Sequence, residues 1–375
     1  MIPYGRQFID EEDIRVVTEV LRSEWLTTGP KVPEFEEALS RYVGSKHAVT
    51  VSSGTAALHA AMYAIGIGPG DEVIVSPITF AASANCIVYQ GGTPVFSDVE
   101  PDTLLLDPEQ IESKITPNTK AIIAIDYAGH PCDYDSLRKI ADQNNLILLA
   151  DACHALGAEY KGVKTGSLAD LNIFSFHPVK HITTGEGGMV VTGETKFAEK
   201  MRRFRNHGIA TDYKQREEQK TWFYEMVELG YNYRITDFQC ALGLSQLKKL
   251  PSLLEKRRRI ASHYDNAFAS VSVIQPLSIK KHALHAYHLY VIKLNLKALG
   301  LSRKKLFQKM RNKGIGANVH YIPAHLHPYY RKNFGTYSNL CPIAEKVYEQ
   351  IISIPIYPGM TDKDIKKVIN VLIGK

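Results

Sequence analysis

One lysine lies in a setting that suits covalent chemistry. Lys180 ends the segment FSFHPVK (174–180), in which a strand-like apolar run passes through a proline into a loop, and the polar stretch TTGEGG (183–188) follows it. A lysine that is partly withdrawn from water has a lowered pKa and favours Schiff-base chemistry with a carbonyl compound. The alternative, a surface lysine in a Gly-rich turn, accounts neither for the polar loop on each side nor for Ser175 at the strand end.

A second feature is the turn SSGTAA (52–57), which joins a predicted strand to a predicted helix. Its glycine permits a tight turn, and the backbone amides of Thr55 and Ala56 would point out of the helix N-terminus. Exposed amides together with the helix dipole bind phosphate, and Ser175 could reach the same phosphate as Thr55. The alternative is an ordinary helix cap formed by Ser53 or Thr55.

An acid and an aromatic residue follow two further strand-like runs. Asp151 ends the run LILLA (146–150), where a buried carboxylate is costly unless it is paired. A pyridinium nitrogen is a fitting partner, because a nearby aspartate keeps that ring protonated and makes it an electron sink. Phe80 follows the predicted strand 72–76 and could lie on one face of a flat heterocycle. The alternatives are a helix cap for the aspartate and core packing for the phenylalanine.

These features are complementary to one cofactor. Their order along the chain is phosphate turn, aromatic residue, aspartate, then serine and lysine, and each follows a predicted strand. Because ligands of a parallel sheet collect at the carboxyl ends of its strands, we expect the four features to meet. Together they predict a pyridoxal 5'-phosphate site with Lys180 and Asp151 as its catalytic residues.

The elements that must position these residues alternate along the chain. The predicted strands are continuous apolar runs, as expected where helices cover both faces of a sheet, at 48–52, 72–76, 94–97, 121–126, 146–151, 172–176 and 189–192. Predicted helices include 11–23, which precedes a loop with Thr27, Thr28 and Gly29, and 55–65, 81–89 and 134–143. Alternating strands and helices indicate a three-layer, mainly parallel α/β domain.

The pattern changes after about residue 230. We predict helices 236–249 and 253–268 separated by Pro251, a strand 288–294, a helix 303–312, a strand 317–321 and two closing helices. This indicates a smaller α+β domain, with residues 1–250 in the large domain and 251–375 in the small one.

Composition limits the other classes of function. The chain has 375 residues and a net charge of +6, and no apolar run approaches the roughly 20 residues that span a bilayer. Two basic runs, 256–259 and 303–305, lie in helix-like segments without interleaved aromatic residues, so we expect solvated helix faces and no nucleic-acid partner. Five scattered cysteines without CxxC spacing predict neither disulfides nor a metal site. The absence of a leader-like N-terminus also favours the cytoplasm.

The motifs SSGTAAL, DACHALGAEY and FSFHPVKHITTGEGG resemble the DegT/DnrJ/EryC1/StrS family of sugar-nucleotide aminotransferases, over nearly the whole chain. The resemblance implies the type I (aspartate aminotransferase-like) fold of pyridoxal-phosphate-dependent transferases and a homodimer with active sites at the subunit interface. It implies that Lys180 forms the Schiff base and acts as acid and base, that Asp151 pairs with the ring nitrogen and that Phe80 stacks on the ring. The residues implied to hold the phosphate are Thr55, Ala56, Ser175 and, from the other subunit, Asn232.

Within the family, IDYAGHPCDYD, KHITTGEGG and YNYRITDFQCALGLSQLKKLP are most similar to the subgroup that aminates C4 of UDP-linked 4-keto-6-deoxy sugars. The transaminase of pseudaminic acid biosynthesis belongs to this subgroup, and the enzyme that makes UDP-4-amino-arabinose is less similar. L-Glutamate is the implied amino donor. His154 stands where many members have glutamine, and either side chain can reach the phenolic oxygen of the cofactor. Candidates for the sugar site are Thr28, His181, Arg234, His320 and Tyr321, of which the last two could instead be ordinary strand residues.

The same residues argue against several other classes of protein. A sugar dehydratase of this fold has histidine in place of the lysine, so Lys180 argues against it, and no cysteine has the surroundings that a desulfurase needs. The run GIGPG (66–70) follows a helix and precedes a strand, the reverse of a dinucleotide-binding loop. Other 3- or 4-keto sugar-nucleotide aminotransferases, including dTDP-linked types, and a non-catalytic cofactor-binding regulator remain alternatives. The nucleotide, the stereochemistry of the sugar, C4 against C3 amination and the protonation of His154 stay open.

Overall fold

The computed structural model describes residues 1–211 and 213–374. Its centre is a seven-stranded sheet in the order β1-β9-β8-β5-β4-β2-β3, parallel except for β9, which runs antiparallel to both neighbours. The strands are β1 (His47–Val51), β2 (Glu72–Val75), β3 (Thr93–Phe96), β4 (Thr119–Ile125), β5 (Ile147–Asp151), β8 (Leu171–Ser175) and β9 (Gly188–Thr192). All seven strands predicted from the sequence are confirmed, each within two residues.

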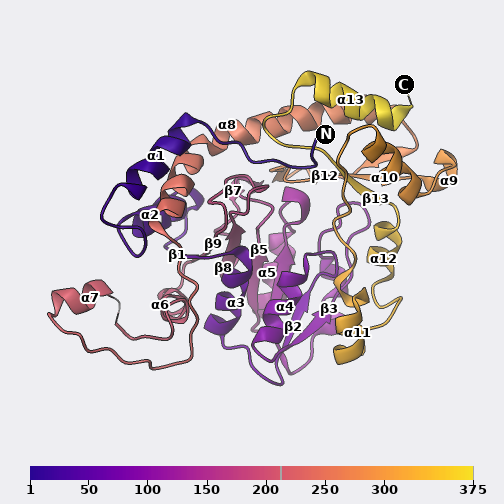
Figure 1. Cartoon of the computed structure of the whole chain (residues 1–375). Coiled ribbons are helices and arrows are strands. Elements are labelled where there is room, and N and C mark those ends of the chain that lie inside the picture. Colours follow the sequence, from indigo (N-terminus) through magenta and orange to yellow (C-terminus); the bar gives the residue numbers. More distant parts are fainter. Residues whose placement is uncertain (212, 375) are drawn as a thin grey trace.

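Helices cover this sheet (Figure 1). The helix α3 is apolar around its whole circumference and buried without a break from Ala56 to Met62, as expected for a helix enclosed between a sheet and other elements. The predicted helices between the strands are confirmed. They are α3 (Gly54–Ile65), α4 (Ala81–Tyr89) and α5 (Tyr134–Gln143), and α6 (Thr195–Phe204) follows β9. Short 3-10 helices lie at Pro108–Gln110, Glu112–Lys114, Tyr127–Gly129 and Ala324–Leu326.

Two predictions for the segment from 236 to 321 were wrong. Pro251 does not separate two helices, because α8 runs continuously over Asp237–Phe268. It changes direction between its first part, beside α2, and the part that crosses the top of the molecule (Figure 1). Its neighbours Leu250, Leu253 and Leu254 are all buried, so packing outweighs the roughly 3 kcal/mol that an interior proline costs. The segment 317–321 is not a strand, because only Asn318 pairs, with Ser353.

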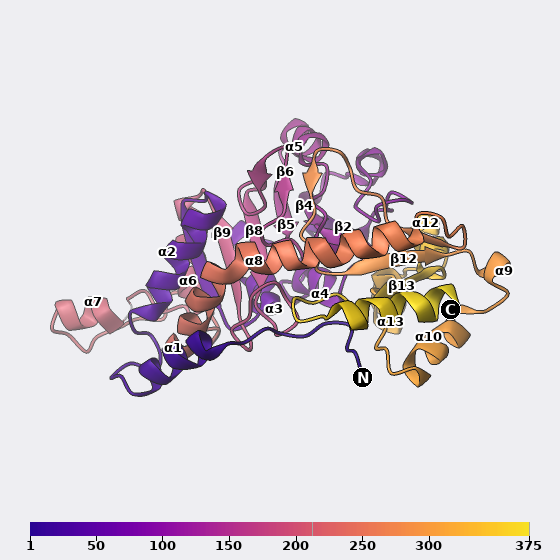
Figure 2. The same cartoon turned by 90° about the horizontal axis from the view of Figure 1, so that it is seen from above.

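The remaining elements flank the large sheet. The N-terminal helices are α1 (Glu11–Leu21) and α2 (Lys31–Val43), and both pack on α8 (Figure 2). A three-stranded antiparallel sheet joins β10 (Ile274–Pro276), β12 (Tyr290–Leu294) and β13 (Ile351–Ile354), and a smaller one joins β6 (Glu159–Tyr160), β7 (Val163–Lys164) and β11 (Ala283–Leu284). Helices of the C-terminal part are α9 (Leu296–Leu299), α10 (Arg303–Asn312), α11 (Pro328–Phe334), α12 (Pro342–Tyr348) and α13 (Asp362–Ile373). The predicted strand 288–294 and helix 303–312 are confirmed. The prediction of two closing helices was wrong, because α11, α12 and α13 follow residue 321 and the strand β13 lies between the last two.

Each of two apolar cores contains residues from both sides of the predicted boundary at residue 250. The core around the large sheet also includes Tyr330, Cys341 and Val347, and a second core joins Ile2 to the C-terminal sheet. The division into 1–250 and 251–375 stays a prediction. Within the described part of the chain, none of the helices is both long and apolar enough to cross a membrane.

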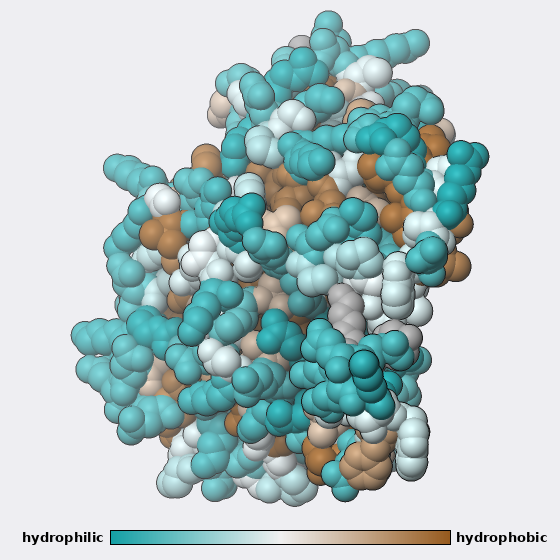
Figure 3. All heavy atoms as spheres, turned by 90° about the vertical axis from the view of Figure 1, so that its left-hand side faces the viewer, coloured by the Kyte–Doolittle hydropathy of each residue, from teal (hydrophilic) through white to brown (hydrophobic). Residues whose placement is uncertain are grey.

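One segment projects from this body. Residues 208–211 and 213–231 form an arm that carries the short helix α7 (Tyr213–Glu218) and extends to the left in Figure 1. Backbone hydrogen bonds tie its two sides together, from Val227 N to Gly208 O (2.9 Å) and from Ala210 N to Glu225 O (3.0 Å). Figure 3 faces this side of the molecule and shows apolar patches among the hydrophilic surface.

Candidate active site

The predicted catalytic features meet at the carboxyl ends of the strands. Ser175 ends β8, and its Cβ lies only 2.9 Å from where a side chain on Gly54 would begin; the same position would be 3.4 Å from Cys153 Sγ. The start of α3 is therefore closed in against the ends of β8 and β5. A glycine is needed at position 54 because any side chain would collide with Ser175.

The turn at the start of α3 is capped and still has free amides. Ser53 is the N-cap, and its Oγ accepts a hydrogen bond from the Ala56 amide (3.0 Å), so the cap interpretation is confirmed for Ser53. Among the described residues, the amides of Gly54 and Thr55 have no hydrogen-bond acceptor. Ser175 Oγ accepts from the His177 amide at 3.4 Å. Free amides at a helix N-terminus and an adjacent hydroxyl fit a phosphate, whereas the amide of Ala56 is already engaged.

Asp151 is held from two sides at the end of β5. The residue is 8% exposed, Ser83 Oγ donates to its Oδ2 at 2.6 Å and the Cys153 amide donates to its Oδ1 at 3.2 Å. Within the described chain the carboxylate forms no ion pair with a basic side chain. A buried carboxylate without a cationic partner fits the protonated nitrogen of a pyridine ring.

Lys180 shares the space next to this carboxylate. It lies in the loop after β8, half-buried, with its backbone amide bonded to His177 O at 2.9 Å. Burial lowers the pKa of its amine, and the negative charges that Cys153 and Asp151 can carry oppose that shift. The amine is thus closer to its neutral, nucleophilic form than a surface lysine would be.

Phe80 precedes α4 and is 62% exposed, which argues against the core-packing interpretation. Its ring centroid lies 6.0 Å from that of Tyr321, at an interplanar angle of 54°. Phe80 is thus a large, exposed aromatic side chain at the start of α4, the helix whose Ser83 bonds to Asp151. This position suits stacking on a flat ring.

Three buried histidines, His154, His181 and His288, lie near Lys180. His154 Nε2 is 3.1 Å from the Tyr321 hydroxyl, and the His154 ring centroid is 4.3 Å from that of His288. Burial, aided by nearby Lys180, puts the pKa of His154 well below its usual value, so its ring is neutral at pH 7. His181 Nε2 donates to Ala286 O at 3.1 Å, and the ring centroids of His181 and His288 are 5.7 Å apart.

The other candidates for the sugar site are scattered. His320 bonds to Ser353 Oγ (2.8 Å) and lies beside Tyr321, so this pair reaches the site through Tyr321. Thr28 is exposed, and Arg234 donates to Asn206 Oδ1 at 2.8 Å. Among described residues, neither is hydrogen-bonded to Lys180 or Asp151.

Asn232 is exposed at the base of the arm, next to Tyr233, whose carbonyl accepts from the Ser52 amide at 2.9 Å. This bond joins the arm to the turn at the start of α3. Whether Asn232 serves the phosphate of the other subunit stays a prediction.

Ser83 and His288 were not identified from the sequence. A serine in the apolar helix 81–89 is a weak signal, although its helical phase places it on the buried side with Cys86 and Ile87. His288 gave no local signal, because its partner His154 is more than 130 positions away in the chain.

Known proteins share this fold. The model of the DegT/DnrJ/EryC1/StrS aminotransferase family matches residues 7–373. The spore coat polysaccharide biosynthesis protein SpsC of Bacillus subtilis is 41% identical over 370 residues, 98% of this chain and 95% of that protein. PseC of Helicobacter pylori, an aminotransferase of pseudaminic acid biosynthesis, superposes with a TM-score of 0.92 at 36% identity, covering 100% of this chain and 98% of that one.

The sugar aminotransferase Spr1654 of Streptococcus pneumoniae, solved in a PMP-form, superposes with a TM-score of 0.93 at 34% identity, over 99% of this chain and 98% of that one. Its PLP-form is also similar. The family model covers nearly every residue of the chain, from 7 to 373. This chain belongs to the DegT/DnrJ/EryC1/StrS aminotransferase family.

Proposed function

We propose that the protein is a pyridoxal-phosphate-dependent sugar aminotransferase that moves the amino group of L-glutamate to C4 of a UDP-linked 4-keto-6-deoxy-N-acetylhexosamine. The observation that carries the aminotransferase chemistry is that a buried Lys180 amine lies near the carboxylate of Asp151, which forms no ion pair with a basic side chain of the described chain. PseC and SpsC, whose names refer to amino sugar and polysaccharide biosynthesis, support the sugar substrate. Similar motifs in the C4-aminating subgroup support the UDP-linked 4-keto sugar and a pseudaminic-acid type of pathway.

The residues present fit the cofactor. The free amides of Gly54 and Thr55 and the hydroxyl of Ser175 would hold its phosphate, and Phe80 would cover one face of its ring. Asp151 would face its ring nitrogen. When bound, pyridoxal phosphate supplies an aldehyde for amino-group exchange and an electron sink for the carbanion formed from the substrate.

Each residue of the site has a distinct task. Asp151, fixed by Ser83, keeps a negative charge beside the ring nitrogen and so favours its protonated state. Lys180 would act as a general base and then a general acid in each half-reaction. In the first it would take the proton from the α-carbon of glutamate and pass it to the cofactor, and in the second it would reverse this transfer by giving a proton to the sugar carbon that receives the amino group. Burial lowers the pKa of the Lys180 amine, which makes it a better candidate for a general base than an exposed lysine. His154, neutral and bonded to Tyr321, orients that tyrosine at the edge of the site.

We also propose that the active enzyme is a homodimer located in the cytoplasm. Trp222, Met226 and Leu229 of the arm are 86%, 64% and 72% exposed, an unusual concentration of large apolar side chains for a free surface. A second copy packed on the arm would cover them and bring Asn232 near a neighbouring site. Five free cysteines support a reducing compartment.

A half-reaction screen tests the substrate. Enzyme first converted by L-glutamate to its amino form is mixed with UDP-, dTDP- and GDP-linked keto sugars, and the return of the original absorbance spectrum is followed. We expect the fastest return with a UDP-linked 4-keto-6-deoxy sugar. Faster return with a 3-keto sugar or with a dTDP-linked sugar would contradict the proposed substrate while leaving aminotransfer intact.

A further inference from the structure

The charge of this protein is unevenly distributed along the chain. Residues 266–344 contain no aspartate or glutamate, and their twelve lysines and arginines exceed the net charge of +6 of the whole chain. The rest of the chain is therefore net acidic, and this stretch produces a local positive potential. Two of its charges, Lys280 and Lys293, are compensated by ion pairs with acidic residues of the segment after β3. Most of the charges at α10 are not.

Four exposed lysines at α10 form what we term the lysine face: Lys304, Lys305, Lys309 and Lys313. They line an open groove of about 690 Å³ together with three uncharged polar residues. The last three of these lysines are spaced by four residues, so they are neighbours along one side of a helix. Among the described residues, the ion pair of α10 is a long one from Arg303 to Glu349 (3.9 Å). The lysine face therefore has no acidic partner within the described chain.

The position of α10 keeps the lysine face clear of the proposed subunit contact. Figures 1 and 2 place α10 at the opposite end of the molecule from the arm that carries α7, so a second copy packed on the arm would leave the face uncovered. The inner side of α10 is fixed to the protein core by the buried Leu306 and Met310, which turns the lysines outward. A side chain on Gly314 would begin 3.6 Å from Lys367 Nζ, so α13 adds a further lysine at the end of the face.

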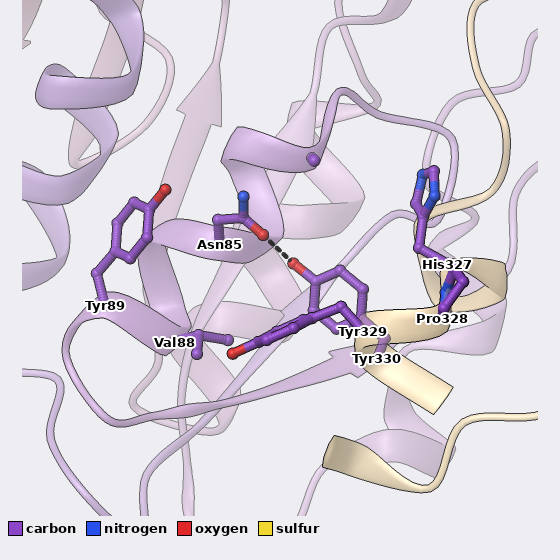
Figure 4. Close-up of a pocket in the computed structure, with 8 residues that line it drawn as sticks. Asn85, Val88, Tyr89, His327, Pro328, Tyr329 and Tyr330 are labelled. Carbon is purple, nitrogen blue, oxygen red and sulfur yellow. Dashed lines mark hydrogen bonds between the residues drawn. The ribbon is translucent and has the colours of Figure 1, made fainter. Parts of the chain in front are cut away.

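The lysine face differs from the groove of about 520 Å³ between α4 and α11. That groove is lined by aromatic side chains, among them Tyr89 and Tyr329, and by no lysine or arginine (Figure 4). The groove at the lysine face has no aromatic or aliphatic residue in its lining. The centres of protein interfaces are poor in lysine and need apolar anchors, and single-stranded nucleic acids bind to stacking aromatic residues. Flexible ammonium groups without such anchors fit a fluid surface of negative charge, such as the headgroups of acidic lipids.

We propose that the lysine face docks the enzyme reversibly on a membrane surface that contains acidic lipids. Each lysine near such a surface contributes about fivefold in affinity. Leu301, directly before α10 and 36% exposed, adds an apolar contact with the headgroup region. The helix stays outside the apolar interior of the bilayer, because its own apolar side is packed in the protein core. The attraction is electrostatic, so it weakens as salt is added.

The test is cosedimentation of the cofactor-loaded enzyme with vesicles. Vesicles of phosphatidylcholine alone are compared with vesicles of equal parts phosphatidylcholine and phosphatidylglycerol at an ionic strength of about 0.1 M, where the Debye length is about 10 Å. We expect binding to the acidic vesicles alone, and release from them at about 1 M salt. Lys305→Gln combined with Lys309→Gln should weaken binding at least about tenfold. The control combines Lys120→Gln with Lys139→Gln, which removes two exposed lysines of β4 and α5 and changes the net charge equally, and it should bind as wild type does.

Circular dichroism melting establishes that each variant is folded, and Lys304→Gln combined with Lys313→Gln is a second pair on the same face if the first does not fold. Wild-type enzyme that binds both kinds of vesicle alike, or neither, would overturn the inference. An equal loss of binding in the control pair would assign the attraction to net charge and not to the lysine face. Tighter binding to double-stranded DNA of random sequence than to the acidic vesicles would make the face a nucleic-acid surface and overturn the inference as well. None of these outcomes depends on which sugar the enzyme aminates.

Discussion

The hydroxyl of Ser83 donates a hydrogen bond of 2.6 Å to the Oδ2 of Asp151, and it is itself 2.7 Å from the hydroxyl of Thr79. This links the first turn of α4, which carries Phe80 at its N-cap, to the acid at the end of β5. Phe80, which we propose to stack on the cofactor ring, and Asp151, which we propose to face its nitrogen, are thus positioned by the same helix. Ser83 acts through Asp151 and is a positioning residue.

Removing this hydroxyl should slow the reaction without unfolding the protein. In Ser83→Ala, one oxygen of a buried carboxylate loses its donor, a loss that we expect to lower the rate of the glutamate half-reaction about tenfold. Ser83→Cys is nearly isosteric and keeps a weak donor, so its rate should lie between those of Ser83→Ala and wild type. Stopped-flow absorbance measures the rates, and the exposed Ser113→Ala is the control. Equal rates for Ser83→Ala and wild type would show that Asp151 is positioned without Ser83.

Asp151→Asn tests the charge itself. The amide keeps the size of the side chain but cannot hold a positive charge on the ring nitrogen, so we expect the transamination rate to fall by at least about 100-fold. The melting temperature should stay close to that of wild type, because the Cys153 amide can still donate to the amide oxygen and the Ser83 hydroxyl can accept from the new amide nitrogen. Near-normal turnover in this variant would refute the electron-sink role of the aspartate.

Lys180→Ala tests the covalent link. Borohydride reduction fixes pyridoxal phosphate irreversibly to the amine that carries it, and mass spectrometry of the reduced protein shows whether the mass has been added. We expect the addition in wild type, located on the peptide with Lys180, and none in Lys180→Ala. Lys164→Ala, at a half-buried lysine of β7, is the matched control and should retain the addition. A covalent addition to Lys180→Ala would assign the amine to another residue.

Much of this arrangement could be predicted because the large sheet is buried on both faces. Such strands appear in the sequence as continuous apolar runs, and the parallel order brings Asp151, Ser175 and the start of α3 to one edge. What could not be predicted depends on contacts between distant segments. The helix α8 continues through Pro251 because its buried leucines keep their phase against other elements, and segment 317–321 lacks a neighbouring strand except at Asn318.

The buried histidines should make stability depend on pH. His130 is 2% exposed. Its Nδ1 donates to Pro131 O at 2.7 Å, and its Nε2 accepts from the Lys280 amide at 3.0 Å. Both ring nitrogens therefore have a hydrogen-bond partner when the ring is neutral. Burial lowers the pKa of His130 to about 4 from 6.5. The unfolded chain therefore binds a proton between these pH values that the folded chain does not. Stability is full above about pH 6.5 and falls as the pH drops toward 4, by up to about 1.4 kcal/mol per pH unit for this residue.

Replacement of this residue measures its contribution. Glutamine does not titrate, so between pH 6.5 and 4.5 the free energy of unfolding of His130→Gln should fall less steeply than that of wild type. The difference in slope should correspond to about one proton fewer taken up on unfolding. Urea denaturation at several pH values gives the slopes, and His263→Gln, at an exposed position, is the control. The same slope in His130→Gln and wild type would mean that His130 is protonated in the folded state. Because His59 and His320 also have pKa values lowered to about 4 by burial, part of the slope should remain in the variant.

The last prediction concerns the proposed subunit interface. Asn232 is exposed next to the bond between Ser52 N and Tyr233 O, at the base of an arm whose apolar side chains lack cover within one chain. If Asn232 completes a site whose Lys180 belongs to the other subunit, mixing Lys180→Ala with Asn232→Ala should create one intact site per heterodimer. Each variant alone should be nearly inactive. Random pairing makes about half of the dimers mixed, and each mixed dimer has one intact site of two. The mixture should therefore recover up to about a quarter of wild-type activity. Native mass spectrometry confirms that heterodimers form. Heterodimers without recovered activity would place Asn232 and Lys180 in the same subunit's site.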